Sequence, residues 1–229
     1  MIQEISESDQ LRSPESVWEP DSRTCFFAGF DKKSVGKYKK SIESQHETIA
    51  SFKLNETVPI HVVINFETAK NLYLYAWFVF RFYPVSEQQA LASLEFALRE
   101  RFPDFVKEQS GKGSLGLRKL LENAIRNKIL KNELFSTRES WAWNRAETRH
   151  SFEMSQKMMA EGLDQIEWNN SDVVVTQEDL DNDWLKDFLE MIPEIRNRHA
   201  HGSDVLMPMV RHTFEVVSEL INQLYPKKI

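Results

Sequence analysis

The chain of 229 residues has little cysteine, no long apolar run and no excess of positive charge. Its single cysteine, Cys25, excludes an intramolecular disulfide and a cysteine-based zinc site. The most apolar stretch, residues 72–80, is far shorter than the ~20 residues that a membrane-spanning helix needs. Residues 1–20 show no basic segment followed by an apolar one, as a secretory signal would. We therefore expect a cytoplasmic protein with no membrane span.

Positive charge is scarce overall, because the formal net charge is −6 and the sequence pI about 5.6. A general electrostatic binder of nucleic acid is usually strongly basic, so any contact with RNA must be local. The 41% of apolar and 28% of charged residues are typical of a globular chain. We expect one main domain over residues 61–229, preceded by an N-terminal arm or small extension over residues 1–60.

The spacing of apolar residues predicts a mainly α protein, an antiparallel helical bundle. The expected helices cover residues 67–82, 87–102, 115–130, 137–161, about 184–192, and from 205 or 208 to 224. Pro84 and Pro103 are expected to end the first two, and Pro193 to kink the fifth or begin a fresh turn. The arm has room for one or two short strands, at residues 24–30 and at the β-branched residues 58–66, which could instead be an extended lead-in.

A polar segment, Arg196-Asn197-Arg198-His199-Ala200-His201-Gly202, separates the last two apolar-faced helices. A segment that contains two arginines and two histidines is not typical of a protein core. On a helix, Arg196 and His199 share one face, as do Asn197 and His201. Gly202 favours the end of a helix at the histidine, because glycine adopts the left-handed conformation that follows many helices.

Arg196-Asn197-x3-His201 resembles the Arg-x4-His motif of the HEPN superfamily (higher eukaryotes and prokaryotes nucleotide-binding). The resemblance implies a helical bundle with the motif near the junction of its last two core helices, and a homodimer that joins two motifs in one cleft. It also implies metal-independent RNA cleavage, in which the ribose 2′-hydroxyl attacks the adjacent phosphate and leaves a 2′,3′-cyclic phosphate. The protein would then be an endoribonuclease without a cofactor, such as a toxin or phage-defence effector with a neutralising partner.

These residue types suit that chemistry. His201 is expected to act as the acid or base, because imidazole exchanges a proton near neutral pH. Arg196 is expected to clamp the phosphate with its planar fork. Asn197 would orient His201 or hold the scissile phosphate, and Arg198 and His199 are auxiliary candidates for RNA contact.

Further candidates lie outside the motif. Glu95 would pair with the motif arginine, as the resemblance implies, or with Arg99 on its own helix face. Arg118 and Lys119 belong to a locally basic region that would contact phosphate groups, although a solvated helix face explains such charges as well. A metal site is not expected, because His199 and His201 point about 200° apart on a helix and lack a third ligand nearby.

Two alternatives to the ribonuclease remain open. A HEPN fold can serve as a non-catalytic module that binds nucleotides, RNA or proteins, since fold does not fix function. The polar segment could also simply cap helix ends and bind carboxylates in an ordinary helical protein.

Overall fold

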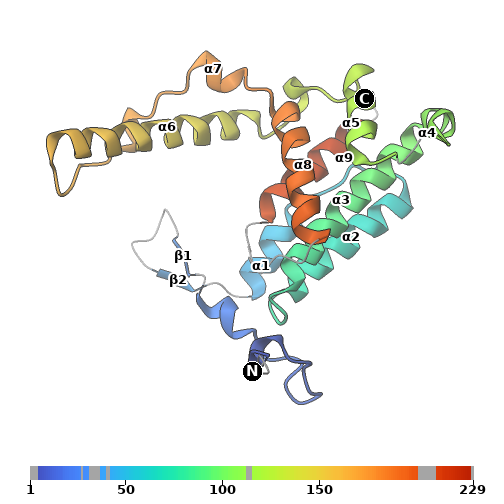
Figure 1. Ribbon diagram of the computed structural model, residues 1–229, viewed down its shortest axis with the longest axis horizontal. Helices are drawn as coiled ribbons and strands as arrows, with labels where there is room; N and C mark the ends of the chain where they lie inside the picture. Colours follow the sequence, from blue (N-terminus) through green and yellow to red (C-terminus); the bar gives the residue numbers. More distant parts are fainter. Residues whose placement is uncertain are drawn as a thin grey trace. The chain divides into compact units, whose positions relative to one another are not determined.

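The computed structural model describes residues 5–26, 28–30, 37–39, 42–111, 115–200 and 210–227 (Figure 1). The backbone alone is described for residues 25, 26, 28–30, 37–39, 193, 194 and 196–200. The protein is mainly α, as the sequence predicts. The helices are α1 (Ile42–Ala50), α2 (Ile60–Tyr75), α3 (Phe82–Arg101), α4 (Pro103–Gln109), α5 (Leu117–Arg126), α6 (Arg138–Glu161), α7 (Gln177–Leu180), α8 (Trp184–Ala200) and α9 (Arg211–Leu224).

The chain folds as two compact units. The main unit comprises Met1–Ile129 and Ile192–Ile229, and the inserted unit comprises Leu130–Met191. Neither limit of the inserted unit coincides with the domain boundary predicted near residue 60. A separate role for residues 1–60 stays a prediction. No helix in the described part of the chain is both long enough and apolar enough to cross a membrane.

The core of the main unit forms around α3. Helices α2 and α3 run side by side, and α9 and α5 pack against α3 (Figure 1). Ring contacts join Phe214 of α9 to two rings of α2, with centroid distances of 5.9 Å to Phe66 and 5.6 Å to Tyr73. The apolar residues whose helical spacing predicts α3 and α9 are buried: Ala90, Leu91, Leu94, Ala97, Leu98, Phe214, Val217, Leu220, Ile221 and Leu224.

The strand expected over residues 58–66 is wrong, because α2 begins at Ile60. The buried side chains of α2 (Val62, Phe66, Ala69 and Tyr73) follow one another at intervals of four, three and four residues. This helical spacing buries one continuous face against α3, and that burial outweighs the preference of β-branched residues for strands.

The expected break at Pro84 is also wrong, since α2 ends at Tyr75 and α3 already begins at Phe82. Pro84 therefore lies in the first turn of α3, where backbone N–H groups have no partner within the helix and a missing one costs little. Helix α3 ends at Arg101 and α4 starts at Pro103, as expected for a proline that opens a helix.

The later helices follow the predicted order with shifted ends. Helix α5 is shorter than expected, covering Leu117–Arg126, whereas α6 begins after Thr137 and ends at Glu161 as predicted. Residues 173–175 form no strand. Helix α8 continues through Pro193 without a fresh turn and reaches Ala200.

The N-terminal arm holds two short strands. Strand β1 (Ala28–Phe30) pairs antiparallel with β2 (Lys37–Lys39), with Gly29 opposite Tyr38. A short strand within residues 24–30 is thus confirmed, whereas β2 lies where no strand was expected.

A buried carboxylate fixes the arm to the connection between α2 and α3. The side chain of Asp21 is fully buried and accepts hydrogen bonds from the Phe80 backbone N–H at 3.0 Å and from the Arg23 Nε and Nη2 atoms at 2.9 and 2.8 Å. Arg23 also donates to Asp9 at 2.9 Å, and Arg81 donates to the same carboxylate at 2.7 Å. Burial acts to raise the pKa of Asp21, but the hydrogen bonds from Arg23 and the backbone outweigh it and lower the pKa.

In the inserted unit the chain after α6 returns alongside that helix and passes through α7 (Figure 1). Arg149 of α6 forms two hydrogen bonds to the buried carboxylate of Asp179, at 2.6 and 2.9 Å. The hydroxyl and backbone N–H of Thr176 donate to the same carboxylate at 2.8 Å each, which caps α7. Ion pairing and helix capping thus hold the return segment, residues 162–183, on α6.

Candidate functional site

Residues 196–200, the described part of the polar motif, form the end of α8. Arg196, Asn197, Arg198 and His199 are helical, and α8 ends at Ala200. Their side chains lie outside the described residues, as do His201 and Gly202 entirely. The predicted end of the helix at His201 therefore stays a prediction, although the described helix ends directly before it.

Buried side chains hold α8 up to the motif. Leu185, Phe188, Ile192 and Ile195 are at most 5% exposed and follow one another at intervals of three, four and three residues. This spacing marks one apolar side of α8, and Arg196 comes directly after its last buried member. The backbone of Arg196 and Asn197 is consequently fixed by a packed helix rather than by a free loop.

The chain re-enters the core immediately after the undescribed residues 201–209. Val210 is 2% exposed, and α9 begins at the next residue. Both ends of the segment that contains His201 are thus anchored in the main unit, at Ile195 and at Val210.

A carboxylate that the sequence analysis missed lies beside the start of α9. Glu87 of α3 is 6% exposed, and its Oε1 atom accepts a hydrogen bond of 2.6 Å from the Thr213 hydroxyl. The sequence could have indicated that Glu87 is buried, because Glu87 precedes Leu94 by seven residues and so lies on the apolar side of its helix. Buried ionisable groups are candidates for functional roles, since burial of charge is costly without a specific partner.

Removal of the Thr213 hydroxyl tests how strongly this carboxylate is held. Thr213→Val should lower the free energy of unfolding by about 1–3 kcal/mol, because a buried acceptor loses its donor without a change in side-chain shape. Urea unfolding followed by circular dichroism measures the change. Thr213→Ser is the matched control that keeps the hydroxyl, and an unchanged unfolding midpoint in Thr213→Val would contradict the role assigned to the bond.

Glu95 forms the local ion pair that the sequence offered as one of two alternatives. Its Oε1 atom accepts hydrogen bonds from Arg99 at 2.8 and 3.1 Å, and the two residues are one helical turn apart. The Glu95 side chain is 20% exposed. Its pairing with the motif arginine stays a prediction.

The predicted auxiliary cations Arg118 and Lys119 are exposed on α5. Arg118 pairs with Glu122 at 3.0 Å, with both side chains about half exposed. Exposed pairs of this kind contribute little to stability and leave the guanidinium accessible to a competing phosphate. Their role in contacting RNA stays a prediction.

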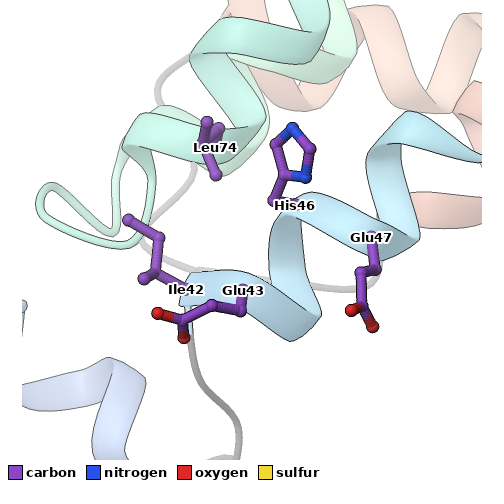
Figure 2. A pocket seen from close by; sticks show the side chains of 5 residues that line it. All are labelled: Ile42, Glu43, His46, Glu47 and Leu74. Atoms are coloured by element: carbon purple, nitrogen blue, oxygen red, sulfur yellow. The ribbon is translucent and has the colours of Figure 1, made fainter.

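A shallow pocket of about 450 Å³ lies elsewhere on the main unit, between α1 and the end of α2. It is lined by Ile42, Glu43, His46, Glu47 and Leu74. Figure 2 shows the imidazole of His46 beside Leu74, while the Glu47 carboxylate points away from them. Because its lining has two carboxylates and no lysine or arginine, this pocket does not suit a phosphate group.

Metal-ligating side chains do not converge within the described residues, where no group of three or more His, Cys, Asp or Glu could hold an ion. The described histidines have other neighbours: His150 packs against Trp168 at a centroid distance of 4.9 Å, and His212 lies 3.4 Å from Glu215.

Comparison of the chain with protein-family models, with curated proteins and with solved structures found no match in any of the three. Its likeness to HEPN proteins accordingly rests on the motif and its helical context alone.

Proposed function

We propose that the chain is a metal-independent endoribonuclease of HEPN type, with Arg196, Asn197 and His201 at its active site. The observation that supports this proposal most is the course of α8, which continues through Pro193 and ends at Ala200. The Arg-Asn pair therefore occupies the last turn of the penultimate helix, and the final helix, α9, packs in the core. This is the context in which the Arg-x4-His motif is expected.

The net negative charge of the chain argues against RNA as a substrate only if that charge surrounds the motif, and the two units differ in this respect. The inserted unit holds 14 acidic and six basic residues, a net charge of −8, whereas the main unit holds 21 acidic and 23 basic residues, a net charge of +2. The acidity of the whole chain thus belongs to the unit without the motif. A slightly basic unit favours the local contacts with phosphate that cleavage requires.

In the proposed reaction, His201 removes the proton from the ribose 2′-hydroxyl as that oxygen attacks the adjacent phosphorus. The bond from phosphorus to the 5′-oxygen breaks, and the leaving oxygen takes up a proton from a histidine or from water. Arg196 stabilises the negative charge that builds on the phosphate oxygens, which a two-pronged guanidinium does well. A homodimer would place two such motifs in one cleft and supply a second histidine for the leaving oxygen.

The test is incubation of the purified protein with RNA in excess EDTA, followed by analysis of the product ends. Metal-independent cleavage that leaves 2′,3′-cyclic phosphate is expected. Binding of RNA without cleavage would favour the non-catalytic alternative, and neither binding nor cleavage would favour an ordinary helical protein. Sedimentation of the same sample measures whether the protein is a dimer.

A further inference from the structure

An apolar stripe on α6 is covered at one end of the helix and open at the other. Trp141, Phe152 and Met159 are spaced by 11 and seven residues, which is close to three and two helical turns, so they lie on one side of α6. Leu163 follows four residues after Met159, just beyond the end of the helix. Trp141, Phe152 and Met159 thus form one line along α6, and Leu163 follows the left-handed Gly162 that ends the helix.

The inserted unit covers only the beginning of this line. Trp141 is 6% exposed and packs against Phe135 and Trp184, at centroid distances of 5.0 and 5.3 Å. No residue of α6 after Ala146 is buried. Phe152 is 63%, Met159 79% and Leu163 42% exposed. Several large apolar side chains exposed on one side of a helix indicate an interaction site more than an ordinary solvated face does.

The return segment is fixed without covering the stripe. Arg149 holds it through Asp179 and through the backbone oxygen of Val174, at 3.0 Å. Trp168 packs on His150 and donates to Asn170 at 2.7 Å. The stripe thus stays exposed although its neighbours are held in place.

Charge identifies the kind of partner that fits. Residues 162–183 contain seven acidic residues and no lysine or arginine. Asp164, Glu167 and Asp172 among them are exposed. A second copy of the same face would bring two units of net charge −8 together, which is unfavourable. A basic partner would instead gain from the same charges.

We propose that Phe152, Met159 and Leu163, with the acidic return segment beside them, form a docking surface for a lysine- or arginine-rich amphipathic helix of another protein. From Phe152 to Met159 the stripe extends ~10 Å at 1.5 Å per residue, which matches roughly two turns of a partner helix. Apolar contacts provide the affinity and the acidic residues select the sign of the partner's charge. The proposal goes beyond RNA cleavage and does not depend on it.

The test uses two synthetic helical peptides of about 14 residues, roughly four turns, with leucine at helical spacing and either lysine or glutamate elsewhere. Fluorescence anisotropy of labelled peptide measures binding to the full chain. The leucine-lysine peptide should bind, with an affinity that falls as salt rises, and the leucine-glutamate peptide should not. Phe152→Ser with Met159→Ser should weaken binding about tenfold or more.

Ile60→Ser with Ile64→Ser is the matched control, because it removes two exposed apolar side chains from α2 in the main unit, 70% and 59% exposed. It should leave binding unchanged. The proposal would be overturned if the double variant at Phe152 and Met159 bound the leucine-lysine peptide as tightly as the wild type does. It would also be overturned if the wild type bound the two peptides equally well. A wild-type dimer that this variant dissociates would also overturn it, because a second copy would then cover the stripe. Thermal unfolding verifies that both variants fold.

Discussion

Replacement of Arg196 or His201 by alanine should lower the rate of RNA cleavage at least ~100-fold. Loss of the histidine removes the group that accepts the 2′-hydroxyl proton, and loss of the arginine removes charge stabilisation of the transition state. Because Ile195 anchors the preceding turn, Arg196→Ala should leave the unfolding midpoint nearly unchanged. Cleavage of a labelled RNA in EDTA, at saturating substrate, gives the rates.

The chain offers matched controls for both variants. Arg126 with Asn127 repeats the Arg-Asn pair at the exposed end of α5, so Arg126→Ala removes the same side chain away from the motif. His212→Ala removes a histidine that is 53% exposed. Both control variants should cleave RNA at the wild-type rate. Arg196→Lys should recover only part of the activity, since lysine keeps the charge but loses the fork. Wild-type rates in Arg196→Ala and His201→Ala would disprove the assigned site.

Replacement of Arg23 by alanine should lower the free energy of unfolding by up to about 3–5 kcal/mol, because the buried Asp21 carboxylate loses its nearest charged partner and keeps only the more distant Arg12, at 3.9 Å. Urea unfolding at neutral pH measures this loss. Arg118→Ala, which breaks an exposed pair, is the control and should cost at most about 1 kcal/mol. Asp21→Asn should offset part of the loss when it is combined with Arg23→Ala, since the uncompensated charge is then absent.

The same ion pairs predict how stability depends on pH. The hydrogen bonds and charges of Arg81 and Arg23 lower the pKa of Asp9 from 3.8 to about 2, and the pKa of Asp21 is lowered as well. Carboxylates with lowered pKa in the folded state stabilise it above their unfolded pKa, and this contribution is lost as pH falls toward the folded pKa. The difference between the wild type and Arg23→Ala should therefore shrink from about pH 4 downward. A difference that stayed constant to pH 2 would contradict this role of Arg23.

Sequence patterns predicted the buried faces better than the ends of the helices. The inward residues of α3 and α9 follow from helical spacing alone, because apolar residues three and four positions apart share one side of a helix. The start of α2 at Ile60 was missed, since the β-branched residues before Phe66 favour a strand until their burial against α3 is known. The break expected at Pro84 was wrong, because the cost of a proline depends on its position in the helix, whereas at Pro193 the fresh turn is absent from α8 and the alternative kink stays a prediction.

The candidate site was predictable in part. The motif is continuous in sequence, so its polar character shows without any knowledge of the fold. Glu87 could be found only by noticing a carboxylate on an apolar stripe, and its bond to Thr213 joins residues that are 126 positions apart. The open stripe on α6 could not be recognised from the sequence, since methionine and aromatic residues at helical spacing normally belong to a core.

The insertion of residues 130–191 within the main unit affects how the protein can fold during synthesis. Helix α3 packs against α9, which is made after the inserted unit, so a nascent chain that ends before Arg211 leaves part of the α3 face unpaired. Glu87 likewise obtains its bond from Thr213 only when α9 has been synthesised. Ribosome-bound chains should thus acquire a protease-resistant main unit late, after the inserted unit has emerged, and assembly of the motif would coincide with completion of the core.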